Sequence, residues 1–145
     1  MKFISSKYDP EWGESFVEMQ HLGIKFPGFA NVHPDDKENA SEYAGCALAE
    51  LRATLAALKY ERRLAKKKSD EAIDFMKSCE GYAKFDKNSD TAKVMYRQVN
   101  RRIKRVNDLT DQINNLLEEI KMFGQKRQII LNAIKRNKEM SKKDK

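Results

Sequence analysis

Apolar residues recur with alternating spacings of four and three through the second half of the chain. Between residues 92 and 120 the repeat is unbroken, and most intervening positions are charged or carry an amide. Its members are Ala92, Tyr96, Val99, Ile103, Val106, Thr110, Ile113, Leu117 and Ile120. A repeat of this kind over about four heptads is typical of one long helix with a coiled-coil seam. Because an apolar stripe is unstable in water, this helix requires a partner.

Residues 44–79 carry a second repeat of the same kind, which supplies that partner. The turn-forming residues 85–90 separate the two repeats, and Ser89 or Asp90 can cap the second helix. A short connection makes consecutive helices antiparallel neighbours. The two repeats align if facing residue numbers sum to 175, which places Met76 opposite Val99. The sequence therefore predicts a long antiparallel helical hairpin.

Residues 1–39 differ from the rest of the chain. They contain all three prolines, the single Trp and both His, and four Lys against seven Asp and Glu give them a net charge of −3. Asp9 followed by Pro10 is typical of a helix start, so we expect a short helix there within an irregular, aromatic-rich N-terminal arm. Residues 40–145 are expected to form the hairpin with a basic C-terminal helix and tail.

The pattern continues beyond Ile120 through Gly124, a residue that can kink or interrupt a helix. We therefore expect a short C-terminal helix followed by a basic tail that frays. Together these elements predict an all-α fold: the antiparallel hairpin with its coiled-coil seam, the short C-terminal helix and the irregular arm.

A second apolar stripe on the second helix suggests self-association. A two-helix seam leaves this stripe in water, so a third element or another subunit should cover it. The aromatic arm is the other candidate contact, and we expect a homo-oligomer. The predicted interface residues are Trp12, Phe16, Leu109, Leu116, Phe123 and Ile130.

The net charge of +7 is unevenly distributed. Residues 40–145 carry +10, and residues 121–145 alone carry nine Lys and Arg against two acids. Such density is typical of phosphate binding, which is independent of nucleotide sequence and sensitive to salt. The candidate nucleic-acid-binding residues are Arg62, Arg63, Lys66, Lys67, Lys68, Arg101, Arg102, Arg105, Lys126, Arg127, Lys135, Arg136, Lys138, Lys142 and Lys143.

The clusters in the middle of the hairpin have a second interpretation. Ordinary salt-bridged helix faces also concentrate charge, and the predicted register brings Glu71 and Asp74 near Arg101 and Arg105. The C-terminal tail is harder to neutralise internally, except by the acidic N-terminal arm. Both interpretations therefore remain open for the hairpin.

Other kinds of site have little support in the sequence. His21, His33, Cys46 and Cys79 lack metal-ligand spacing, and neither a phosphate-binding glycine loop nor a nucleophile–base pair is evident. We expect no enzymatic activity, cofactor or metal. No apolar run approaches the roughly 20 residues that span a membrane, and the chain starts without a secretion signal, so we expect a cytoplasmic protein.

A family resemblance lies in two stretches of the predicted hairpin. The run YAGCALAEL at residues 43–51 leads into the Lys- and Arg-rich helix, and EIKMFGQKRQ at residues 119–128 follows the second repeat. From about residue 40 to residue 139 this layout resembles small all-helical phage recombination mediators, and small terminase subunits look similar. The resemblance implies a phage protein, in the host cytoplasm, that forms oligomeric rings. It also implies binding to single-stranded DNA and contacts with recombinase and single-strand-binding protein.

Two functions follow as hypotheses. The first is a non-catalytic, oligomeric nucleic-acid-binding accessory protein that contacts the phosphate backbone, with single-stranded DNA as the preferred partner. The alternative is a protein-interaction module, such as an anti-defence inhibitor, an adaptor or a virion assembly factor, whose basic face meets an acidic protein surface. Binding to random-sequence DNA as a function of salt separates the two hypotheses.

Overall fold

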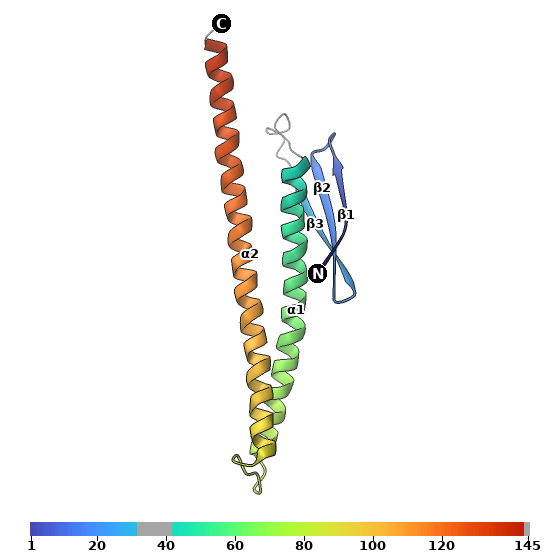
Figure 1. The fold of residues 1–145 in the computed structure, drawn as a ribbon, viewed down its shortest axis with the longest axis vertical. Coiled ribbons are helices and arrows are strands. Elements are labelled where there is room, and N and C mark those ends of the chain that lie inside the picture. Colours follow the sequence, from blue (N-terminus) through green and yellow to red (C-terminus); the bar gives the residue numbers. More distant parts are fainter. Residues whose placement is uncertain (32–41, 144–145) are drawn as a thin grey trace. The chain divides into compact units, whose positions relative to one another are not determined.

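A computed structural model describes residues 1–31 and 42–143 of the protein, without the side chains of residues 42–43, 126–131, 134–135, 138 and 141–143. Its elements follow in the order β1 (Lys2–Asp9), β2 (Glu14–His21), β3 (Ile24–Asn31), α1 (Glu42–Glu80) and α2 (Asp90–Lys143) (Figure 1). The fold is therefore α+β. The prediction of an all-α fold with an irregular N-terminal arm is wrong.

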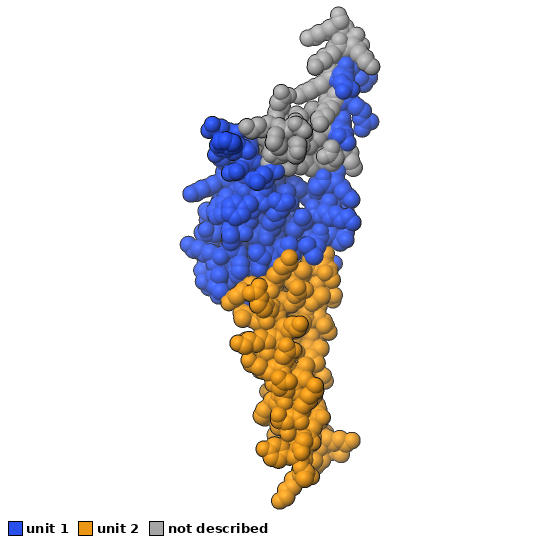
Figure 2. All heavy atoms as spheres, turned by 180° about the vertical axis from the view of Figure 1, so that it is seen from behind, with its two compact units in different colours: residues 1–57, 115–145 blue, residues 58–114 orange. Residues whose placement is uncertain are grey.

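The chain divides into two compact units, which Figure 2 colours separately. Unit 1 comprises residues 1–57 and 115–145, and unit 2 comprises residues 58–114. Each long helix thus contributes one part to each unit. The boundary predicted between residues 39 and 40 falls outside the described residues.

The three N-terminal strands form an antiparallel meander in which β2 lies between β1 and β3. Along β2, Ser15, Val17 and Met19 are buried, whereas the residues between them are partly exposed. This alternation is the signature of a sheet with one covered face. The sequence concealed this alternation, because the buried Ser15 is polar, the neighbouring Phe16 on the other face is apolar, and each strand is only eight residues long.

The expected short helix at Asp9 and Pro10 is a turn between two strands. The Asp9 side chain accepts a hydrogen bond from the backbone N–H of Glu11 at 3.0 Å, two residues on, which is an Asx turn rather than a helix cap. Gly13 then adopts a φ of 65°, a left-handed conformation that is readily accessible to glycine. The chain reverses there, so Phe16 and Val17 enter β2 instead of continuing a helix.

A two-residue turn joins β2 to β3. Leu22 and Gly23 have φ values of 54° and 76°, and His21 pairs with Ile24 directly across the turn. Two successive positive φ values match the right-handed twist of a hairpin. This Leu-Gly turn explains why an aromatic-rich stretch predicted to be irregular is a regular strand.

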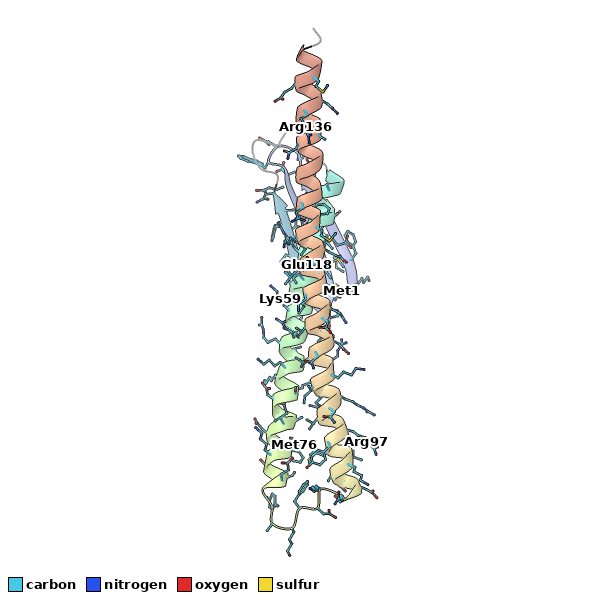
Figure 3. All side chains as sticks on the ribbon, turned by 90° about the vertical axis from the view of Figure 1, so that its left-hand side faces the viewer. Met1, Lys59, Met76, Arg97, Glu118 and Arg136 are labelled. Atoms are coloured by element: carbon cyan, nitrogen blue, oxygen red, sulfur yellow. The ribbon has the colours of Figure 1, made fainter. Side chains whose placement is uncertain are left out.

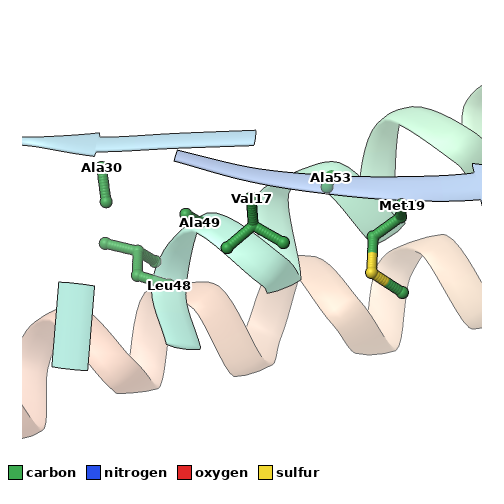
Figure 4. Packing of buried hydrophobic residues seen from close by; sticks show 6 residues of the cluster. All are labelled: Val17, Met19, Ala30, Leu48, Ala49 and Ala53. Carbon is green, nitrogen blue, oxygen red and sulfur yellow. The ribbon is translucent and has the colours of Figure 1, made fainter. Parts of the chain in front are cut away.

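The core of unit 1 lies between the sheet and the first half of α1 (Figure 4). Its buried members are Val17, Met19, Ala30, Leu48, Ala49 and Ala53, with Ile120 and Phe123 of α2 packed against them. Small residues set the spacing of the two layers. A Cβ atom on Gly28 of β3 would lie 1.9 Å from the backbone oxygen of Ala49. The strand can therefore approach α1 this closely only with glycine at position 28.

The two long helices and the turn between them agree with the sequence. Ser89 caps α2, because its hydroxyl accepts a hydrogen bond from the backbone N–H of Ala92 at 3.2 Å. In unit 2 the helices run antiparallel, so the helical hairpin is confirmed there. The expected short C-terminal helix is wrong, since α2 continues through Gly124 to Lys143 as one helix of 54 residues.

The contacts across the hairpin keep the predicted register near the turn and depart from it farther along the helices. Tyr96 bonds to Glu80, a sum of 176 that is close to the predicted 175, whereas Arg102 bonds to Lys68 and Arg105 to Glu61, sums of 170 and 166. Along α2 the buried face also leaves the predicted heptad repeat. Ile103 and Leu117 are 37% and 43% exposed, whereas Leu109 and Leu116 are 0% and 8% exposed.

Candidate nucleic-acid interface

The positive charge of the protein is concentrated in unit 2. Residues 58–114 contain fifteen Lys and Arg against nine Asp and Glu, a net of +6. Unit 1 contains fourteen basic and thirteen acidic residues, a net of +1. The unit that has the sheet and its core is therefore nearly neutral. The helix pair accounts for almost the whole net charge.

Within unit 2 the charge gathers in two facing stretches. Residues 59–68 of α1 and residues 101–105 of α2 contain ten Lys and Arg against one acid, Glu61. Because the helices are antiparallel, these stretches meet across the pair. Two hydrogen bonds show this, one from Arg105 to the Glu61 carboxylate and one from Arg102 Nη1 to the backbone oxygen of Lys68 at 3.2 Å.

These contacts change the predicted charge pairing. Arg105 pairs with Glu61 and not with Glu71 or Asp74. The side chain of Glu61 is 16% exposed, so the pair is partly protected from water. We conclude that Arg102 and Arg105 join the two helices. They have less freedom to bind a ligand than the other candidate residues.

Four basic side chains of α1 line one hollow in unit 2. Lys59, Arg62, Arg63 and Lys66 surround it, and Val106 and Thr110 of α2 complete it, with a volume of about 550 Å³. Their spacings of three and four residues place the four on one face of the helix. Within the described part of the chain, none of the four forms an ion pair. Figure 3 labels Lys59 at the start of this stretch.

The sequence analysis included three of these four residues among the candidates. It left out Lys59, although its position three residues before Arg62 and four before Arg63 is the helical spacing that marks the face. It assigned Val106 and Thr110 to the seam between the helices, and did not place them beside these basic residues.

The remaining predicted binding residues lie on both helices. Lys67, Lys68 and Arg101 are exposed on the helix pair of unit 2. Arg136 is exposed on the C-terminal part of α2. Six candidates have side chains outside the described ones: Lys126, Arg127, Lys135, Lys138, Lys142 and Lys143. The candidates with described side chains therefore lie in unit 2, apart from Arg136.

The predicted oligomer residues are separated by the structure. The expected exposed stripe is wrong at Leu109 and Leu116, which are buried within the chain, and Phe123 packs on the core of unit 1. The side chain of Ile130 lies outside the described ones. Trp12, in the turn between β1 and β2, is 63% exposed, and Phe16 of β2 contacts Phe29 of β3, with ring centroids 5.1 Å apart and planes tilted by 52°. Trp12 and Phe16 are the two members that remain at the surface.

A second hollow of unit 2 is mainly apolar. It has a volume of about 390 Å³, and Ala72 and Phe75 of α1 line it together with Val94, Met95 and Val99 of α2. Phe75 is 64% exposed beside it. Among the described residues, no three His, Cys, Asp or Glu lie close enough to hold a metal ion. No helix in the described ranges is both long and apolar enough to cross a membrane.

Comparisons with protein-family models, with curated proteins and with solved structures find no match to this chain. The resemblance to phage recombination mediators therefore stays a prediction. The functional argument has to rest on the residues of the helix pair.

Proposed function

We propose that the protein is a non-catalytic nucleic-acid-binding accessory protein of the cytoplasm, and that the helix pair of unit 2 binds the phosphate backbone. The observation that carries the proposal is the hollow lined by Lys59, Arg62, Arg63 and Lys66, in which four cations lie together without an ion pair in the described chain. Like charges held this close repel one another. An anionic ligand removes that repulsion, and a polyanion also releases its condensed counterions.

The residues of the hollow favour contacts with phosphates over contacts with bases. Lys and Arg side chains on a helix surface reach the backbone oxygens of a nucleic acid, which carry no sequence information. The hollow contains no aromatic ring on which a base could stack, because its non-basic lining is Val106 and Thr110. We therefore expect binding without sequence preference. Single-stranded DNA is the first probe, because a flexible strand can follow a short local cluster of cations.

A salt titration with a matched pair of variants tests the proposal. The first variant replaces Lys59, Arg62, Arg63 and Lys66 by Gln, which keeps helix propensity and side-chain length while removing four charges. The control replaces Lys77, Lys84, Lys87 and Lys93 by Gln, which removes the same charge from the two helix ends of unit 2 and the turn between them. Fluorescence anisotropy then reports the affinity of each protein for a random-sequence oligonucleotide over a range of salt concentrations.

We expect the first variant to bind much more weakly than the control. For single strands, log K falls with log salt at a slope of about −0.7 per phosphate contact, so losing the hollow should make the slope clearly shallower. The control should keep most of the affinity and the slope. Equal losses in the two variants would show that only the net charge matters, and would contradict the assignment of the hollow.

The apolar hollow supports a second candidate function, a protein-interaction module. An exposed Phe75 beside Val94 and Met95 is the kind of surface that protein partners cover, and the positive charge of unit 2 suits an acidic partner. This candidate predicts feeble DNA binding by the intact protein, with no difference between the two Gln variants. The same titration therefore distinguishes the two functions.

A further inference from the structure

The two edge strands of the sheet, β1 and β3, differ in how their outer backbone groups are protected from pairing with another strand. The edge at β3 is protected, because Pro27 has no N–H to offer and Arg52 of α1 donates a hydrogen bond to the backbone oxygen of Phe29 at 2.7 Å. The edge at β1 has no such cover. In the described part of the chain, no backbone hydrogen bond outside the sheet involves residues 2–9. An edge strand without cover can pair with another strand.

A bulge in β1 decides which of its side chains share a face. Phe3 pairs with Met19 and Ser5 pairs with Glu18, so Ile4 is an extra residue between two adjacent rungs. Without the bulge, residues an odd number apart would point to opposite faces. With it, Lys2 and Asp9 both point away from α1. Phe3 and Tyr8 both lie on the face that β2 turns toward α1.

This arrangement makes the strand complementary to itself. If two copies of β1 pair antiparallel about Ser6, with Ile4 left in its bulge, then Lys2 faces Asp9 of the other copy and Phe3 faces Tyr8. Each pair occurs twice by symmetry, and both members lie on the same face of the sheet, as direct cross-strand neighbours must. Opposite charges and aromatic rings are both favourable in that position. Phe3, which is 49% exposed in the single chain, would gain an aromatic neighbour.

We propose that β1 is the self-association site of this protein, and that two chains join their sheets through an antiparallel β1–β1 pair centred on Ser6. The inference is independent of nucleic-acid binding, since it uses no residue of unit 2. The interface of the expected homo-oligomer is then formed by the β1 edge and not by Leu109 or Leu116. A single pair of eight-residue strands is a small interface, and interfaces below about 1,200 Å² are usually weak. We expect a concentration-dependent dimer.

Charge reversal tests the pairing in the full chain. Lys2→Glu places a carboxylate opposite Asp9 of the other copy, and Asp9→Lys places an ammonium group opposite Lys2, so each variant alone should dissociate. A mixture of the two variants restores both attractions in the mixed dimer. Lys84→Glu is the control, since it makes the same charge change as Lys2→Glu in the turn between the helices.

Sedimentation velocity over a concentration series gives the dissociation constant of each sample. We expect each single variant to raise it by about tenfold, because two favourable cross-strand pairs become two repulsive ones. The mixture should return near the wild-type value, and Lys84→Glu should leave it unchanged. A wild-type protein that stays monomeric at every concentration, or a mixture that dissociates like its components, would overturn the proposal.

A cysteine variant provides a test that does not depend on the Asp9 turn. In the proposed register the two copies of Ser6 are directly opposite, with Cα atoms about 4.5 to 5.5 Å apart, within the range that a disulfide bridges. Ser6→Cys in a Cys46→Ala, Cys79→Ala background should therefore form a covalent dimer under mild oxidation. Ser5→Cys is the matched control, because residue 5 faces Lys7 and not its own copy. Equal crosslinking of both variants, or of neither, would contradict the register.

Discussion

The two units of this protein differ in how closely they are packed and in their net charge, although both contain parts of the same two helices. Unit 1 packs its sheet on α1 so closely that Gly28 leaves no room for a Cβ atom, and its charges nearly cancel. Unit 2 consists of two helices with open hollows between them and carries +6. Close packing needs small, uncharged residues, whereas a cationic surface needs long side chains that repel one another. We infer that unit 1 supplies most of the stability and unit 2 the binding surface.

The largest expected effect tests the close packing of unit 1. Gly28→Val should destabilise the protein by more than about 4 kcal/mol, because the new Cβ would overlap the backbone oxygen of Ala49 and no flexible side chain can give way. Val is favourable in strands, so any loss comes from the contact with α1. Chemical denaturation followed by circular dichroism measures the change. Gly124→Ala is the control, since nothing lies within 4 Å of that position, and we expect a small gain in stability.

The next effect tests where the buried face of α2 lies in each unit. Leu109→Ala should cost about 3 to 5 kcal/mol, because Leu109 is fully buried in unit 2. Leu117→Ala in unit 1 should cost much less, because that side chain is 43% exposed. The heptad repeat predicts the reverse order. Thermal melts in which Leu117→Ala is the more damaging change would restore the predicted seam and contradict the structure.

A smaller effect tests how much the Glu61–Arg105 ion pair contributes to the stability of the positively charged unit 2. Glu61→Gln removes the partner of Arg105 and the single acid of the cationic stretches, and should lower stability by about 0.5 to 1 kcal/mol, since Arg105 is half-exposed. The loss should shrink as salt screens the repulsion among the remaining cations. Denaturation at low and high salt measures it. A loss that does not change with salt would mean that Glu61 acts through packing alone.

The smallest effect concerns Tyr96 of unit 2, whose hydroxyl donates to Glu80 Oε1 at 3.1 Å. Partial burial raises the pKa of Tyr96 above its ordinary value of 10.0, and the bond to the Glu80 carboxylate adds to the shift. The folded state therefore holds the phenol proton more tightly than the unfolded state. This small stabilisation is present below about pH 10 and is lost as the pH rises through the raised pKa.

Tyr96→Phe should abolish that pH-dependent part of the stability. Denaturation at about pH 8 and at about pH 11 measures it as a difference between the two proteins. The difference should favour the wild-type chain at the lower pH and disappear at the higher one. A difference that is the same at both values would show that the bond to Glu80 does not persist in solution.

The sequence by itself determined the two helices, the turn between them and a helix start at Ser89 or Asp90, of which the structure selects Ser89 as the cap. Those features depend on neighbouring residues: an apolar repeat along one helix, a run of turn formers, and a hydroxyl three positions before the N–H that it caps. The cationic stretches were also evident, because charge can be counted in the chain. Three of the four residues around the basic hollow were identified in this way.

The tertiary structure decided the rest. Ser15, Val17 and Met19 form one buried side of the sheet only because α1 covers that side. The sequence of an eight-residue strand does not show which other element covers it, so these three residues were not recognised. The spacing of sheet and helix depends on Gly28 meeting Ala49, two residues on different elements. The register of the helix pair depends on which of two stripes of α2 meets α1. Heptad spacing cannot choose between them, because both stripes repeat every seven residues.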